Sequence, residues 1–200
     1  MGMDVYGLSP TIRVNTKKPE RPKDFGKASR KVIDKYFKEE DEYEDKNPGV
    51  YFRNNCWWWR PLGYFIIEKC DWLTEEQKKH LQDNSGFDFS EDEALSIGDT
   101  LQKKVDDGTA KVREEVNKRE RAVADEWNKG INAQQDELEK EVIKETGNAK
   151  IVPYDYSEPF KKKWDDLQKQ IDRNAHYPFK EANVKEFICF LRECGGFKVC

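Results

Sequence analysis

Apolar residues recur at helical spacing over much of the chain. In segments 157–171 and 183–194 they fall three or four positions apart, which places them on one side of a helix. The same spacing predicts helices over 27–45, 61–69, 74–81 and 90–107, two of which begin with a capping-box pattern. The apolar faces of the two C-terminal segments consist of Phe160, Trp164, Leu167 and Ile171, and of Val184, Phe187, Ile188, Leu191 and Cys194.

Three segments instead indicate extended structure. Met1–Gly7 alternates apolar and polar positions, and 197–199 reads as a short last strand that could pair with it. Segment 50–59 is rich in β-forming residues, so we expect it to be extended, with Pro61 opening the helix that follows. The predicted fold is α+β and helix-rich, with a small sheet of short strands from the N-terminal, Trp-rich and C-terminal segments.

Segment 109–147 is dominated by charged and amide residues and carries a thin apolar stripe. Several stripe residues recur after eleven positions, a period that keeps one face on a nearly straight helix. Such a helix would be roughly 55 Å long, so we expect it to project as one helix or to fold back as a hairpin. The stripe consists of Val112, Val116, Val123, Trp127, Ile131, Leu138 and Val142.

We therefore predict a single domain over 1–200. Its core body would comprise 1–10, 50–108 and 150–200. Segment 11–49 would be an insertion with one amphipathic helix, and 109–147 a long charged excursion.

Composition narrows the function classes. The 200 residues are 38% charged and carry a net charge of −4, and the 36 basic residues are interleaved with 40 acidic ones, which argues against nucleic acid as a ligand. No apolar run is long enough to span a bilayer. The five Cys include no Cys-x-x-Cys pair and no metal-ligand spacing, so we expect free thiols, a cytoplasmic protein, no metal and no cofactor.

The Trp-rich segment supplies the main candidate binding residues. In an extended strand Trp58 would point away from Trp57 and Trp59, leaving one face open. Trp side chains beside Arg can stack a nucleobase and hold a phosphate. Alternatively, the Trp side chains form the core and the Arg side chains pair with surface carboxylates. The predicted ligand-binding residues in this segment are Arg53, Asn55, Trp57, Trp58, Trp59 and Arg60.

Two further candidates lie elsewhere. His80 with Asp83 and Asn84 could support acid–base chemistry or ligand binding, although a helix-end His beside a turn Asp explains the same residues. On the long helix, the richest apolar patch could anchor a partner or pack on its own domain. That patch consists of Val123, Trp127 and Ile131.

Three separated motifs carry a resemblance: GMDVYG at 2–7, YFRNNCWWWRPL at 51–62 and FLRECGGF at 190–197. Together they resemble a family of small uncharacterised proteins of bacteriophages and some bacteria. The resemblance covers about half of the chain and implies a viral origin and a body built from 1–10, 50–108 and 150–200. Segment 111–150 lacks the paired Cys of some relatives, so no zinc site is carried over, and the family offers no activity to carry over.

We expect a non-catalytic, phage-type binding protein acting in the host cell cytoplasm. It would counter host defence by sequestering a nucleotide-type signal on the Trp/Arg face. Alternatively, it binds a host or viral protein, or a second copy of itself, through the long helix as an inhibitor or assembly factor. A third hypothesis is a hydrolase that uses His80 and Asp83.

Overall fold

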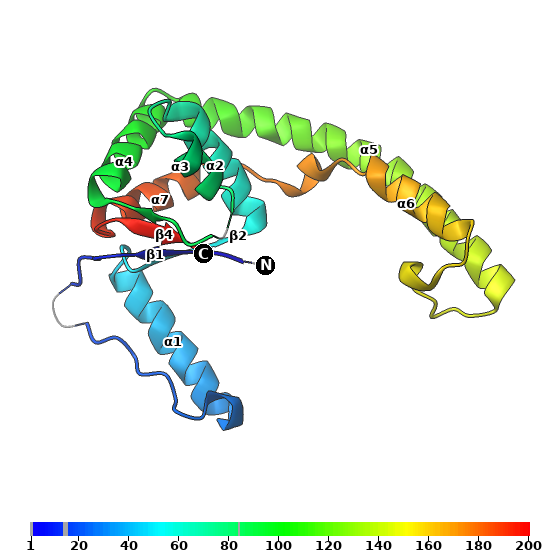
Figure 1. Ribbon diagram of the computed structural model, residues 1–200, viewed down its shortest axis with the longest axis horizontal. Helices are drawn as coiled ribbons and strands as arrows, with labels where there is room; N and C mark the ends of the chain where they lie inside the picture. The colour runs from blue at the N-terminus through cyan, green and yellow to red at the C-terminus, as the bar shows by residue number, and fades with distance from the viewer. Residues whose placement is uncertain (1, 14–15, 84) are drawn as a thin grey trace. The chain divides into compact units, whose positions relative to one another are not determined.

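A computed structural model of the chain describes residues 2–13, 16–83 and 85–200 (Figure 1). Met1 and Asn84, which belong to two of the predictions, lie outside the described residues. The chain forms two compact units: a sheet unit, Met1–Glu114 with Phe179–Cys200, and a helical unit, Glu115–Pro178. This division differs from the predicted one, because 150–178 belongs with the long helix and 11–49 belongs with the sheet.

The sheet has the antiparallel strand order β2-β1-β4-β3. The three predicted strand segments all contribute, and the pairing of the N-terminal strand with the last strand is confirmed. The short strand β3 was not predicted. The α+β, helix-rich fold class is confirmed. The strands are β1 (Gly2–Gly7), β2 (Tyr51–Asn55), β3 (Asp88–Phe89) and β4 (Phe197–Val199).

Alternation along β1 decides which face of the sheet becomes the core. Met3 and Val5 are buried, whereas Asp4 and Tyr6 lie on the opposite, outer face. Figure 1 shows α2, α4 and α7 on one side of the sheet and α1 on the other. These helices are α1 (Arg30–Lys46), α2 (Cys56–Lys69), α4 (Glu91–Asp106) and α7 (Glu181–Glu193).

Both predicted capping boxes are present. Thr74 and Gln77 cap α3 (Glu75–His80), and Ser90 and Glu93 cap α4. In each case the side chains at the two ends of the box satisfy backbone N–H groups that the first helical turn leaves unpaired. A one-turn 3-10 helix, η1 (Phe25–Lys27), precedes α1.

The prediction that 50–59 is extended is wrong beyond Asn55. The side-chain oxygen of Asn55 accepts hydrogen bonds from the backbone N–H groups of Trp57 (3.0 Å) and Trp58 (3.1 Å), so α2 already begins at Cys56. Pro61 therefore lies inside α2 and does not open it. The N-cap outweighs the β propensity of the aromatic run.

Two glycines allow α7 to turn sharply into β4. Gly195 and Gly196 have φ values of +58° and +89°, in the left-handed region that favours glycine. A Cβ on Gly195 would lie 2.2 Å from the carbonyl oxygen of Ser9. The turn therefore needs glycine for both conformation and space.

The helical unit is built on α5 (Thr109–Thr146), one continuous helix whose first residues belong to the sheet unit. Segment 147–178 returns along it and contains η2 (Pro153–Asp155), α6 (Phe160–Gln170) and η3 (Arg173–His176). The buried positions of α5 within this unit are spaced first by seven residues and then alternately by four and three, which is a heptad pattern. They are Asn117, Ala124, Asn128, Ile131, Gln135, Leu138 and Val142.

The eleven-residue stripe predicted for this helix is therefore wrong as a packing face in its first half, whereas Ile131, Leu138 and Val142 of its second half are buried. Val116, Val123 and Trp127 are exposed, and the heptad positions that replace them include three amides. Apolar periodicity could not reveal this face because amide side chains count as polar in such a pattern. In the described part of the chain, no helix combines the length and apolar character needed to cross a membrane.

Candidate ligand-binding site

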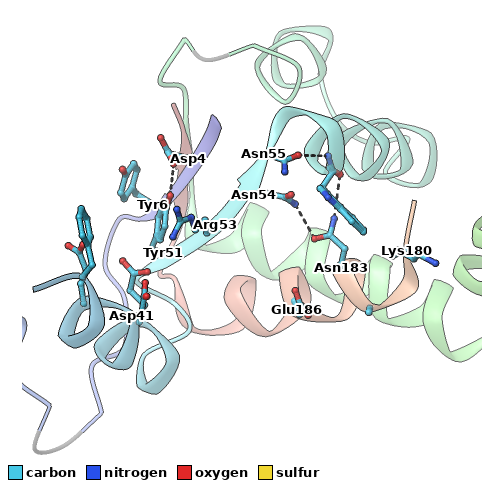
Figure 2. A pocket seen from close by; sticks show the side chains of 15 residues that line it. Asp4, Tyr6, Asp41, Tyr51, Arg53, Asn54, Asn55, Lys180, Asn183 and Glu186 are labelled. Atoms are coloured by element: carbon cyan, nitrogen blue, oxygen red, sulfur yellow. Dashed lines mark hydrogen bonds between the residues drawn. The ribbon is translucent and has the colours of Figure 1, made fainter. Parts of the chain in front are cut away.

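A hollow of about 1010 Å³ lies along the outer edge of β2, within the sheet unit (Figure 2). We call it the edge hollow. Strands β1 and β2, the second half of α1, the start of α2 and the start of α7 contribute to its lining. Its lining side chains include those of Asp4, Tyr6, Glu40, Asp41, Glu44, Tyr51, Arg53, Trp58, Asn183 and Glu186.

The outer face of the sheet supplies an aromatic and acidic wall. The Tyr6 and Tyr51 rings are tilted against each other with centroids 5.0 Å apart. The Tyr51 hydroxyl donates a hydrogen bond to the Asp4 carboxylate. Burial and this hydrogen bond raise the pKa of Tyr51 above its ordinary value, so the hydroxyl keeps its proton.

The opposite wall is fixed by an amide relay. Asn54, which is 8% exposed, donates through Nδ2 to Oδ1 of Asn183 at 3.0 Å. Asn183 Nδ2 in turn donates to the backbone oxygen of Trp58 at 3.4 Å. Figure 2 shows this relay linking β2 to α2 and α7. The relay thus holds three elements in a defined arrangement around the hollow.

The charge in the edge hollow is predominantly negative. Five carboxylates line it, against the two basic side chains of Arg53 and Lys180. Lys180 is already paired with Glu114 at 2.7 Å. The carboxylates are those of Asp4, Glu40, Asp41, Glu44 and Glu186.

The surroundings of Glu44 in the hollow raise the pKa of its carboxyl group. Burial, reinforced by the charges of Glu40 and Asp41, raises its pKa to about 7, although Arg53 and Lys18 act in the opposite direction. At neutral pH a negative charge on Glu44 therefore lacks sufficient compensation. A positively charged group placed in the hollow would supply it.

Only part of the predicted Trp/Arg set meets here. Arg53, Asn55 and Trp58 line the hollow, although the side-chain oxygen of Asn55 is engaged as the cap of α2. Trp57 and Arg60 are exposed on α2 and are not among the lining residues. The six residues do not form one face, because the consecutive Trp side chains are spread around a helix.

Trp59 is a core residue and cannot contact a ligand. Its side chain is fully buried, its indole N–H donates to the backbone oxygen of Leu81 at 2.7 Å, and its ring meets Phe187 edge-on at 5.5 Å. The alternative interpretation of the Trp run, as core, therefore applies to Trp59.

Sequence reasoning missed the acidic side of the hollow. The signals were present: alternation places Asp4 and Tyr6 together on the outer face of β1, and Glu40 and Glu44 are spaced to share one side of α1. What the pattern could not show was that α1 packs beside β2 and brings these two groups together.

His80 and Asp83 lie outside the edge hollow, in the turn that leads to β3 at the other end of the strand order. Nδ1 of His80 faces both the Asp83 carboxylate, at 3.2 Å, and the Ser85 hydroxyl, while the ring stacks on Phe87 with centroids 4.7 Å apart. A catalytic triad needs the acid on one ring nitrogen and the nucleophile on the other. This arrangement instead closes a turn.

The predicted partner patch on α5 is split by the fold. Ile131 is 4% exposed, whereas Val123 is 72% and Trp127 57% exposed. The indole N–H of Trp127 donates to the backbone oxygen of Gln170 at 2.9 Å, so one edge of this side chain packs within its own unit. Val123 and the outer surface of Trp127 remain accessible.

The cysteines and acidic clusters offer no metal centre among the described residues. All five Cys are free thiols. Burial raises the pKa values of the Cys70 and Cys194 thiols to about 11, so both stay protonated and unreactive.

No protein-family model, curated protein or solved structure matches the chain. The resemblance of its three motifs to a phage protein family stays a prediction.

Proposed function

We propose that the protein acts by binding, and that the edge hollow takes a positively charged organic group, an ammonium or a guanidinium. The observation that carries the proposal is the excess of carboxylates over basic side chains in a hollow that also contains aromatic rings. Carboxylates pair with such a cation, and aromatic faces attract it.

A nucleotide-type ligand fits this hollow less well. A phosphate group would meet five carboxylates against the one basic side chain of Arg53, because Lys180 is engaged by Glu114. Repulsion between the phosphate and carboxylates in the same hollow disfavours binding. The proposal thus keeps the predicted binding role and replaces the anionic ligand by a cationic one. A role in countering host defence is supported only by the motif resemblance.

Titration calorimetry with agmatine, which carries both cationic groups, tests the proposal. We expect binding at pH 8 that weakens with added salt, and a loss of affinity of about tenfold in Glu44→Gln or Trp58→Ala. Glu42→Gln makes the same charge change on α1 outside the lining and should bind as the parent does. Tight binding of AMP with no binding of agmatine would contradict the proposal and favour the nucleotide hypothesis.

A second candidate function, association through α5, is favoured by the exposure of Val116, Val123 and Trp127 along one side of the helical unit. Sedimentation at increasing concentration tests whether a second copy binds there. Val123→Glu should abolish association. Val152→Glu introduces the same charge at another exposed valine of this unit and should not. A monomer at all concentrations would argue against self-association.

A further inference from the structure

We infer that the positively charged ligand is an extended peptide segment, which adds to the free edge of β2 in antiparallel pairing and places alternate Lys or Arg side chains in the edge hollow. This inference rests on the proposed cationic specificity and adds to it the backbone of the ligand. Three observations carry it: the position of β2 in the sheet, the direction of its backbone groups and the charge beside it.

The first observation is the strand order. β2 is a terminal strand of the sheet, paired on one side with β1, and no other described strand pairs with it. An edge strand presents a row of N–H and C=O groups that another chain can use. Addition of an extended peptide to such an edge is a recurrent mode of recognition.

The second observation is the direction of those groups. Asp4 exchanges both backbone hydrogen bonds with Cys200, at 2.9 and 2.8 Å, so its backbone faces the β4 side of β1. The N–H of Gly7 donates to the oxygen of Val50, so alternate residues of β1 face β2. With Asp4 opposite Arg53 in the register, the backbone groups of Tyr51 and Arg53 point away from β1.

The third observation is that this open edge borders the hollow. The side chains of Tyr51, Arg53 and Glu186 line it (Figure 2). Glu40 and Glu44 from α1 also belong to the lining. A peptide residue opposite Arg53 in an antiparallel pair has its side chain on the same face as Arg53. Basic side chains at alternate positions of the peptide would therefore reach the carboxylates.

The charge also selects among possible occupants. A second copy of this chain, adding through its own β2, would bring two acidic hollows together, which like-charge repulsion disfavours. An acidic peptide is disfavoured for the same reason. A basic extended segment satisfies both the backbone edge and the carboxylates.

A short synthetic peptide in which Lys alternates with Thr tests the inference by calorimetry on the full chain. The Lys residues that face the hollow are those whose N–H groups point at β2 in antiparallel pairing. Methylation of the backbone nitrogen at the Lys residues should therefore weaken binding by about tenfold or more, since it removes hydrogen bonds to the edge of β2 and keeps the side-chain charge. Methylation of the backbone nitrogen at the Thr residues should leave the affinity nearly unchanged.

The outcomes separate this inference from the proposed function. A loss of affinity that occurs only when the backbone nitrogens of the Lys residues are methylated supports antiparallel addition to β2. If agmatine binds but the peptide binds no tighter, or if both methylated peptides bind equally, the inference is overturned and the cationic specificity stands. If neither agmatine nor the peptide binds, both are overturned.

Discussion

The two units bury their surfaces by different means. The sheet unit packs aromatic rings against one another, with Phe187 in contact with Phe52, Trp59 and Phe197. The buried stripe of α5 in the helical unit instead mixes apolar side chains with Asn117, Asn128 and Gln135. One unit relies mainly on apolar burial, and the other adds a row of polar contacts.

The polar row follows the irregular chain that returns along α5. Asn117 donates to the backbone oxygen of Tyr177 at 3.1 Å, and Arg121 to that of Ala175 at 2.9 Å. Asn128 and Asp172 exchange two hydrogen bonds, at 2.9 and 2.8 Å. Chain that is neither regular helix nor strand has backbone groups that need partners when buried. The amide side chains of α5, together with Arg121, supply those partners.

The largest expected effect concerns the aromatic core of the sheet unit. Trp59→Ala should lower the free energy of unfolding by about 4 kcal/mol, because it opens a large cavity and leaves the Leu81 carbonyl without its indole donor. Urea denaturation followed by circular dichroism measures this loss. Trp57→Ala, at a position 43% exposed, should lose much less. Equal losses would contradict the assignment of Trp59 as the core residue.

The polar row of the helical unit is tested by Asn128→Ala. It strips both partners from the Asp172 backbone and should cost about 2 kcal/mol. Hydrogen exchange should show a loss of protection at the backbone amides of 115–178, while the backbone amides of the sheet unit keep their protection. Asn132→Ala, at an exposed position of the same helix, is the matched control. Loss of protection throughout both units would show that they do not open separately.

A third substitution makes the helical unit resemble the sheet unit more closely. Gln135 is buried on the heptad stripe, and its side-chain nitrogen has no hydrogen-bond partner in the structure. Gln135→Leu should therefore stabilise this unit by about 1.5 kcal/mol. Gln134→Leu, at an exposed position, should not. Thermal denaturation of both variants compares them, and destabilisation by Gln135→Leu would contradict the expectation.

The smallest expected effect is pH-dependent and belongs to the sheet unit. The pKa of Glu44 rises to about 7 in the folded protein, from an ordinary value of 4.5, so the fold holds a proton that the unfolded chain releases in this window. The contribution of Glu44 to stability therefore falls as pH rises from about 4.5 to about 7. Glu44→Gln should stabilise the protein by about 1 kcal/mol at pH 8, after allowance for solvent screening.

The same change should have little effect near pH 4, where Glu44 is protonated in the folded state and mostly protonated in the unfolded state. Urea denaturation at both pH values measures the difference, with Glu42→Gln as the control on α1. A gain that does not depend on pH would contradict the assigned pKa and its cause.

Local signals in the sequence predicted much of the secondary structure. The capping boxes at Thr74 and Ser90 and the alternation of β1 act within a few residues, and the structure contains each of them. The same local reasoning misplaced the start of α2. Two local preferences competed there, and the cap of Asn55 prevailed over the β propensity of the Trp run.

The edge hollow could be predicted only in fragments. The sequence places Arg53 and Trp58 in one short segment, but the carboxylates that set the charge of the hollow come from residue 4, from 40–44 and from residue 186. No periodicity relates positions so far apart in the chain. Their meeting depends on β1 pairing with β2 and on α1 lying beside that edge.

The sequence by itself determined the helix-rich α+β class and most element boundaries, because capping, turn and periodicity signals are short-range, whereas the structure showed that segment 109–146 is one helix and not a hairpin. The tertiary structure alone decided which faces of the Trp-rich segment and of α5 are buried. It placed Trp59 in the core and Trp58 in the hollow. It also brought three amides into the packing stripe of α5, because a side chain's environment depends on the backbone packed against it.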